Sequence, residues 1–207
     1  MNKIGRLVTH PLFFMPMVFT PASLLAQSPF DGTWITEQDQ SKPSQKPVVV
    51  SLNKGIFLCS SCNPKVEIKA DGTDHPVAGL SFDTESVREI DAKKVAFTDK
   101  KAGKLLYEKT AILSDDGNTL TQKVIFHLEN SDQTMNQELT FTRLEKGPAG
   151  AHETTGAWRL DKNTISENAR TSTYKSSGEA FSMSTPIGVS YAAELDGKDY
   201  PVKGGMG

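Results

Sequence analysis

Two cysteines separated by two serines have the clearest chemical potential in this chain. The segment reads Cys59-Ser-Ser-Cys62, and this spacing suits a dithiol redox centre, half of a zinc site or a short structural disulfide. A redox thiol usually lies at a helix N-terminus, whereas the residues on both sides of this pair have strand character. A zinc ion would need two further ligands, for which His75 and His127 are the candidates. A disulfide is the expected state if the chain enters an oxidising compartment, and the other two alternatives stay open.

Pairs of carboxylates occur in a nine-residue motif that the chain carries twice, at residues 71–79 and 196–204. Calcium binding is conceivable, but a calcium loop normally supplies more oxygen ligands within a dozen residues. We therefore expect the first Asp of each motif to shape a turn, and the second to stay solvated or to cap a backbone N–H group. His75 and Tyr200 share one position, which favours packing over base catalysis. The residues that the two motifs share, and that we expect to have a structural role, include Asp71, Gly72, Asp74, Pro76 and Gly79 in the first and Asp196, Gly197, Asp199, Pro201 and Gly204 in the second.

Signatures of catalysis are missing from the sequence. There is no GxGxxG segment, no phosphate-binding glycine loop and no HExxH segment. The nearest approach to a nucleophile elbow, Gly188-Val-Ser190-Tyr-Ala192, lacks the second glycine. His75, His127 and His152 lie in no recognisable catalytic frame. The sequence therefore predicts no enzyme, no catalytic residue, no metal and no cofactor.

The residues around these features have the pattern of short antiparallel strands. Apolar residues alternate with polar ones, as at 65–70, and Gly, Asp or Asn separates each segment from the next. Asp71-Gly72 is one such turn, because Gly tolerates the positive φ that a tight hairpin requires. No segment after the N-terminal region shows a helical apolar stripe, so we expect an all-β, up-and-down antiparallel barrel. The expected strands are 32–36, 48–52, 56–59, 65–70, 86–90, 95–99, 105–113, 119–128 and 137–144.

A whole domain of this kind is repeated in tandem. Gly32-Thr-Trp34 returns as Gly156-Ala-Trp158, an offset of 124 residues, and the nine-residue motif returns at an offset of 125. Two separate landmarks that agree within one residue indicate duplication of a long unit rather than a short solenoid repeat. We expect Trp34 and Trp158 to plug one end of each barrel, rather than to stack on a ligand.

The second copy is incomplete. We assign a signal peptide to 1–26, a complete barrel to 27–146, a linker to 147–155 and a truncated second repeat, a half-barrel, to 156–207. A half-barrel leaves open strand edges and an uncovered apolar face. Either the sequence is a truncated form of a two-barrel protein, which we favour, or the half-copy docks on the first barrel or on another chain.

The order of these motifs resembles the lipocalin-like repeats of exported, largely uncharacterised bacterial proteins. The resemblance rests on the two Gly-x-Trp openings, each followed about forty residues later by Asp-Gly-x-Asp-x-Pro-Val-x-Gly. It continues in the segments 87–91, 100–104 and 114–119, so it covers the first copy almost completely and half of the second. It implies a lipocalin-like barrel, in some members in tandem. It carries no catalytic residue onto this chain, and fold alone does not define function.

The N-terminus predicts export. Lys3 and Arg6 precede an apolar stretch, and cleavage near Ala26 is expected, which gives a periplasmic or extracellular protein in which Cys59 and Cys62 form a disulfide. Without residues 1–26 the chain has 21 basic and 25 acidic side chains, a net charge of −4. These charges are interspersed, so neither nucleic acid nor an anionic lipid surface is an expected partner. Three prolines interrupt the apolar stretch, and no integral membrane segment is expected after it.

Two functions are consistent with these features. The first is a binding module, whose barrel interior holds a small and largely apolar molecule. The alternative is a structural or interaction module that associates with itself or with another chain through the open strand edges of the half-copy.

Overall fold

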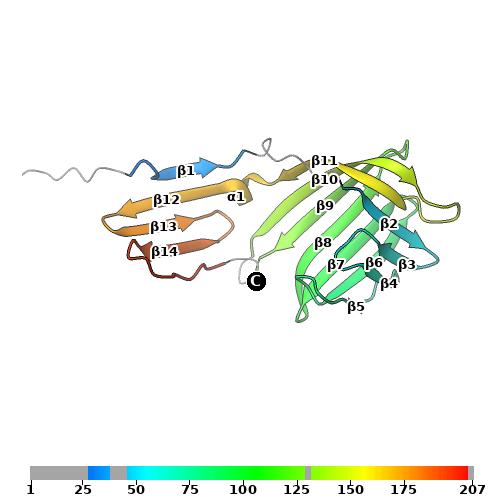
Figure 1. Cartoon of the computed structure of the whole chain (residues 1–207), viewed down its shortest axis with the longest axis horizontal. Helices are drawn as coiled ribbons and strands as arrows, with labels where there is room; N and C mark the ends of the chain where they lie inside the picture. Colours follow the sequence, from blue (N-terminus) through cyan, green and yellow to red (C-terminus); the bar gives the residue numbers. More distant parts are fainter. Residues whose placement is uncertain (1–27, 38–45, 129–131, 205–207) are drawn as a thin grey trace, which may run out of the picture.

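The computed structural model describes residues 28–37, 46–128 and 132–204 and is nearly all β (Figure 1). Its strands form a nearly closed ten-stranded antiparallel barrel and a separate four-stranded sheet. The all-β antiparallel fold expected from the sequence is therefore confirmed. The predicted signal peptide, residues 1–26, lies outside the described residues. Within the described ranges, no helix is both long and apolar enough to cross a membrane.

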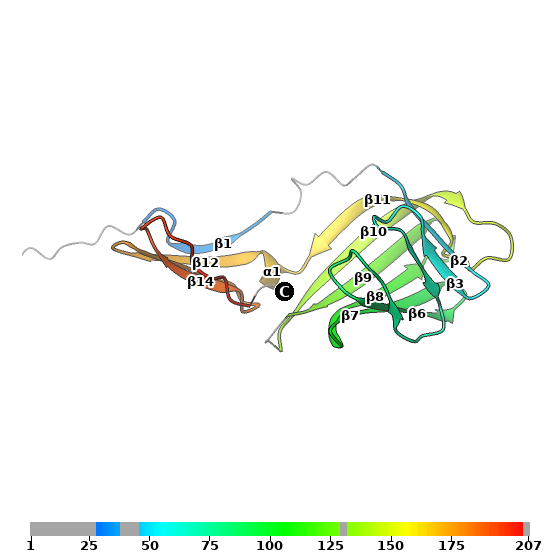
Figure 2. The same ribbon diagram turned by 60° about the horizontal axis from the view of Figure 1, so that its bottom comes forward.

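The large sheet contains every strand from β2 to β11. Its spatial order is β4-β3-β2-β11-β10-β9-β8-β7-β6-β5, and Figure 2 shows it curling round on itself. All neighbouring strands are antiparallel. The strands are β2 (Val48–Asn53), β3 (Ile56–Cys59), β4 (Val66–Lys69), β5 (His75–Pro76), β6 (Thr84–Asp91), β7 (Lys94–Lys101), β8 (Lys104–Leu113), β9 (Thr119–His127), β10 (Thr134–Lys146) and β11 (Gly156–Ile165).

Alternating side chains fill the interior of this barrel. In β7, Val95 and Phe97 are buried while the residues between them are less so, as a two-residue period requires. The same alternation in the neighbouring strands places one apolar row per strand inside. The buried core is Leu52, Phe57, Cys59, Val66, Ile68, Val87, Val95, Phe97, Ala111, Leu113, Leu120, Phe141 and Trp158.

The first nine-residue motif connects the two ends of the nearly closed sheet. Asp71 forms an isolated bridge with Arg88 of β6, and the Gly72 N–H donates to the Val87 carbonyl oxygen at 2.8 Å. Gly72 has a φ of +78°, which an L side chain rarely adopts. The motif also contains β5, which pairs with the start of β6. The residues repeated in the sequence therefore join one end of the curled sheet to the other.

The small sheet is built from both ends of the chain. Its order is β1-β12-β13-β14, and Figure 1 shows β1, in blue, beside strands drawn in orange and red. The one helix of the described residues, α1 (Glu167–Arg170), lies between the two sheets in the sequence. The strands are β1 (Gly32–Ile35), β12 (Thr171–Ser177), β13 (Ala180–Ser184) and β14 (Ser190–Glu194).

The two first strands are exchanged between the repeats. β11 opens the second repeat, yet it lies between β10 and β2 in the barrel of the first. β1 opens the first repeat, yet it pairs with β12 of the second. As a result Trp158 is 1% exposed in the barrel core, whereas Trp34 is 53% exposed on the small sheet. We expected Trp34 to plug the first barrel, and Trp158 occupies that place instead.

The exchange preserves the strand register. Trp158 lies opposite Val48, and Trp34 lies opposite Ser172, which is 124 residues after Val48. Each indole Nε1–H donates to the carbonyl oxygen four residues earlier, that of Thr154 at 3.1 Å or of Phe30 at 3.0 Å. The two tryptophan segments therefore occupy equivalent positions, each in the sheet of the other repeat.

Residues 147–155, expected to be a linker between domains, pack on the barrel. The His152 N–H donates to the Leu52 carbonyl oxygen at 2.9 Å, and Thr155 is 4% exposed. The guanidinium of Arg143 donates to the carbonyl oxygens of Thr155 and Glu153 and lies 4.2 Å from the centre of the Trp158 ring. The boundary between the two sheets therefore does not fall at residues 147–155, where the sequence predicted a linker. The strand after this loop, β11, still belongs to the large sheet.

The exchange predicts unequal consequences for the two tryptophans. Trp158→Ala leaves a void in the barrel core and should lower the free energy of unfolding by roughly 3–5 kcal/mol. Trp34→Ala removes a half-exposed side chain and should cost no more than about 1 kcal/mol. Urea unfolding followed by far-UV circular dichroism measures both. Equal losses, or a larger loss for Trp34→Ala, would contradict the exchanged arrangement.

Candidate functional site

The barrel encloses a cavity of about 330 Å³. It is partly enclosed, and its wall comes from strands β2 to β4 and β6 to β11. Most of its lining is aliphatic or aromatic, and few polar side chains interrupt this surface. The apolar lining residues are Val48, Val50, Leu52, Phe57, Val66, Leu80, Phe82, Val95, Phe97, Ala111, Leu120, Phe141 and Trp158.

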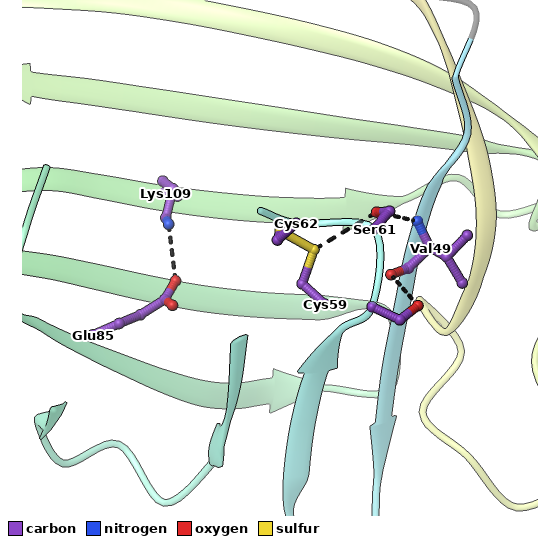
Figure 3. The surroundings of a disulfide bond; sticks show 7 residues. Val49, Cys59, Ser61, Cys62, Glu85 and Lys109 are labelled. Atoms are coloured by element: carbon purple, nitrogen blue, oxygen red, sulfur yellow. Dashed lines mark hydrogen bonds and ion pairs between the residues drawn. A yellow bond between two sulfur atoms is a disulfide. The ribbon is translucent and has the colours of Figure 1, made fainter. Parts of the chain in front are cut away.

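Three charged side chains from adjacent strands meet at one wall of the barrel. The Lys109 ammonium of β8 donates to Glu85 Oε1 of β6 at 2.9 Å and lies 2.7 Å from Asp99 Oδ2 of β7. Glu85 is 4% exposed and Asp99 is 1% exposed, so water contributes little to their solvation. Glu85 and Lys109 both line the cavity. Figure 3 shows these two side chains directed toward one another beside the disulfide.

The acid–base balance of this cluster is strongly perturbed. Burial raises the pKa of Asp99 from its ordinary 3.8 to about 6, although the ammonium of Lys109 opposes the rise. Nearby Glu85 raises it further. Burial acts against the charge of Lys109, but the attraction of Glu85 and Asp99 raises the pKa of that ammonium overall. The cluster therefore holds one firmly charged cation and two carboxyl groups, one of which releases its proton with difficulty.

Aromatic rings surround the cluster. The Lys109 Nζ lies 5.3 Å from the centre of the Phe97 ring and 5.4 Å from that of Phe82, within the range of a cation–π interaction. Phe82 also meets Tyr107 edge to face, and Tyr107 meets Phe126 in the same way. The charged wall is thus bordered by large apolar surfaces that displace water and strengthen its electrostatic interactions.

The predicted cysteine pair lies at the same cavity. Cys59 and Cys62 are at disulfide distance, with sulfur atoms 2.01 Å apart, and both residues line the cavity. Ser61 between them accepts a hydrogen bond from the Val49 N–H at 2.8 Å, which ties the short loop to β2 (Figure 3). No helix begins at this pair, which lies between β3 and β4. The geometry is that of a structural disulfide that closes a short loop at the cavity wall.

The first nine-residue motif lies away from the cavity lining. Asp71 Oδ1 accepts hydrogen bonds from the Thr73 hydroxyl at 2.7 Å, the Thr73 N–H at 3.0 Å and the His75 ring at 2.9 Å. The Thr73 hydroxyl, the Thr73 backbone and the His75 ring hold the pKa of Asp71 well below its usual range. Asp74 pairs with Lys100 at 2.7 Å instead of remaining solvated. These contacts shape and fix a turn.

The first Asp of the second motif makes similar contacts. Asp196 accepts hydrogen bonds from the Lys198 side chain at 2.6 Å and the Lys198 N–H at 3.1 Å. Lys198 and the side chain of Tyr200 lower the pKa of Asp196. His75 and Tyr200 therefore play the same structural role, since the side chain of each forms a hydrogen bond with the first Asp of its motif. The sequence suggested packing for this position and did not identify the hydrogen bond.

The other residues of the two motifs lie in strands, loops and turns. Pro76 belongs to β5, while Gly79, Gly197 and Gly204 have positive φ. Asp199 and Pro201 lie in the loop after β14.

The remaining histidines are dispersed. His127 pairs with Glu108 at 2.9 Å, and His152 lies 2.7 Å from the Asp91 carbonyl oxygen. Among residues 28–37, 46–128 and 132–204, no group of three or more His, Cys, Asp or Glu side chains is placed to hold a metal ion. The structure thus brings Cys59, Cys62 and Trp158 to one cavity and leaves the two Asp-Gly motifs outside it.

The charged cluster is the part of the site that the sequence interpretation missed. Its signal was the strand phase, because an alternating strand that buries Val95 and Phe97 must also direct Asp99 inward. Likewise Lys109 is in phase with the buried Ala111, and Glu85 with the buried Val87. A single charged residue at an inward position can simply lie at the exposed end of its strand. Charged residues at inward positions of three adjacent strands indicate a site.

Comparisons with protein-family models, with curated proteins and with solved structures found no match. The class of the molecule is therefore defined by its own fold and cavity. It is an antiparallel β-barrel with an internal cavity, a buried charged cluster and an attached four-stranded sheet.

The raised pKa of Asp99 predicts how stability depends on pH. A carboxyl group with a higher pKa in the folded state binds more protons there, so its ionisation weakens folding as pH rises from about 4 to above 6. Asp99→Asn removes that ionisation and should raise the free energy of unfolding at pH 8 by up to roughly 3 kcal/mol. At pH 4 the substitution should change it little.

Denaturant unfolding at several pH values measures this difference. Glu138→Gln is the matched control, because Glu138 is an exposed carboxylate of β10, a strand that pairs with none of β6, β7 and β8. This control should leave the pH profile unchanged. A loss of stability for Asp99→Asn at pH 8 would show that the ionised carboxylate contributes favourably to folding.

Proposed function

We propose that this protein is an exported lipocalin-like barrel that binds a small, largely apolar molecule in its cavity. The observation that carries the proposal is the cavity of about 330 Å³, with an apolar lining and one polar wall. Small-molecule sites in proteins are concave, mostly apolar and supplied with a few polar groups that fix orientation. Small antiparallel barrels either fill their interior with side chains or hold one ligand there.

Side-chain sizes on the interior face support this proposal. Ala111 lies opposite Gln122 in the β8–β9 ladder, and both line the cavity. A barrel stabilised only by its own packing would place larger apolar side chains at such central positions, since cavities cost stability. The disulfide between Cys59 and Cys62 supports export as well, because such bonds persist in oxidising compartments. The lipocalin-like class itself rests on the resemblance of the two repeated motifs.

A second candidate function is association through the small sheet. β1 and β14 are its edge strands, and a strand edge presents backbone groups that another strand can pair with. Apart from a bridge between Ser190 and Lys203, the described residues contribute no further strand beside β14. The face that carries Trp34 corresponds, at an offset of 124–125 residues, to the interior face of the barrel. Its other large side chains are Tyr174, Phe181, Met183 and Tyr191.

The cavity proposal predicts binding of an uncharged fluorescent probe. N-phenyl-1-naphthylamine should gain fluorescence with the mature protein and bind with a stoichiometry of one. Ala111→Phe fills the cavity and should abolish the gain, whereas Thr110→Phe adds the same ring on the other face of β8 and should not.

Far-UV circular dichroism establishes that both variants keep their strands. Fluorescence titration then decides. Unchanged binding by a folded Ala111→Phe variant would place the probe elsewhere and contradict the proposal.

The association proposal predicts a concentration-dependent oligomer. Light scattering after size exclusion should show a mass above that of one chain, and Tyr191→Lys should restore the monomer by placing a charge on the aromatic face. Ala192→Lys, on the opposite face of β14, is the matched control and should leave association intact. A monomer at all concentrations would dismiss this candidate.

A further inference from the structure

The charged wall of the cavity has more negative than positive groups. Glu85 and Asp99 are directly opposite one another on β6 and β7, and Lys109 comes from β8 beside them. With all three groups ionised, the cluster has a net charge of −1. The ligand of such a wall must therefore bring positive charge or hydrogen-bond donors.

Lys109 cannot serve as the receptor for an anion. Its ammonium is within 2.9 Å of Glu85 Oε1 and 2.7 Å of Asp99 Oδ2, so both carboxylates neutralise it. A carboxylate or phosphate that approached Lys109 would come close to two like charges in a site with little water. The cluster therefore disfavours a fatty acid or another anionic amphiphile.

An unused acceptor remains in the cluster. Asp99 Oδ1 is buried and has no hydrogen-bond partner among the described residues, while Asp99 as a whole is 1% exposed. A buried acceptor without a donor is costly. Asp99 itself does not line the cavity, but its carboxylate adds negative charge next to Glu85 and Lys109, which do.

We propose that the cavity takes an apolar molecule ending in one protonated amine, whose ammonium donates to Glu85, the carboxylate that lines the cavity, and is attracted by the charge of Asp99 beside it. This inference rests on the proposed function of the cavity and specifies its ligand class. With the amine bound, two ammonium groups alternate with two carboxylates, and the net charge of the wall becomes zero. Phe82 and Phe97, which already face a cation, provide ring surfaces that favour a second one nearby.

A matched series of ligands tests the class. Octylamine, octanol and octanoate share one chain and differ in the charge of the head, so each is used to displace N-phenyl-1-naphthylamine from the mature protein at pH 7.5. Octylamine should bind at least roughly tenfold more tightly than octanol, since a charge-assisted hydrogen bond replaces a neutral one. Octanoate should bind more weakly than octanol.

Two further measurements connect the preference to the cluster. Asp99→Asn brings the net charge of the cluster to zero and should abolish the preference for octylamine over octanol, while Glu138→Gln, outside the cavity, should keep that preference. In the unsubstituted protein, the ratio of octylamine to octanol affinity should fall between pH 8 and pH 5. Asp99 takes up a proton in that range, with Glu85 facing it from β6 and Tyr107 and Lys109 facing it from β8.

The possible failures are distinguishable. If the naphthylamine probe does not bind, the proposed function fails. If the probe binds but octanoate competes as well as octylamine, the function stands and the amine class is overturned. If Asp99→Asn does not fold, the pH series on the unsubstituted protein decides, and a ratio that stays constant refutes the role of Asp99.

Discussion

The barrel depends on the placement of β11 between β10 and β2. A curled sheet exposes unpaired backbone groups wherever two strands fail to meet, and a third strand that pairs with both removes that cost. β11 pairs with β10 from Gln137 to Lys146 and with β2 around Val48. Gly156 allows the close approach, because a Cβ there would lie 2.3 Å from the Glu145 carbonyl oxygen. With β11 in that place, the position next to β2 is filled and β1 pairs elsewhere.

The residues just before the two Gly-x-Trp segments explain which strand goes where. In the barrel, the Thr155 hydroxyl accepts from the Leu52 N–H at 2.9 Å and donates to the Leu52 carbonyl oxygen at 3.2 Å. Asp31 is the equivalent residue just before β1. Its carboxylate could not donate to the Leu52 carbonyl oxygen, which would keep the hydrogen bond from the His152 N–H but would face an acceptor in place of the Thr155 hydroxyl. In the small sheet Asp31 instead accepts from the N–H and the hydroxyl of Ser176, the counterpart of Leu52. Each strand is thus matched to the partner that it has, and Asp31 is mismatched with the partner of β11.

Most strands of the barrel could be predicted from the sequence, because the alternation of apolar and polar residues that marks a strand involves only neighbouring residues. Val95 to Asp99 alternates so clearly that β7 was predicted within two residues of its bounds. The positive φ of Gly72 was also predicted correctly, but the hairpin expected at 71–72 does not form, because Asp71 bridges to Arg88 of β6. The exchange was beyond such reasoning, since Gly-Thr-Trp34 and Gly-Ala-Trp158 have the same pattern and the same register. The choice between them depends on Asp31, Thr155, Leu52 and Ser176, which are far apart in the sequence. The charged cluster of the cavity was not predicted for a related reason. Its three charged side chains come together only because β6, β7 and β8 are adjacent in the sheet.

The buried cluster is better explained by binding than by stability. Two carboxylates and one ammonium in a site with little water cost desolvation that their attraction does not fully return, and apolar side chains of similar size usually stabilise such positions. Burial raises the pKa of Asp99 to about 6, so at neutral pH its ionised form weakens the fold. An apolar residue at that inward position would have completed the row of Val95 and Phe97. A chain that keeps a charge there, and whose described residues offer no donor to Asp99 Oδ1, retains a polar wall that packing alone does not require.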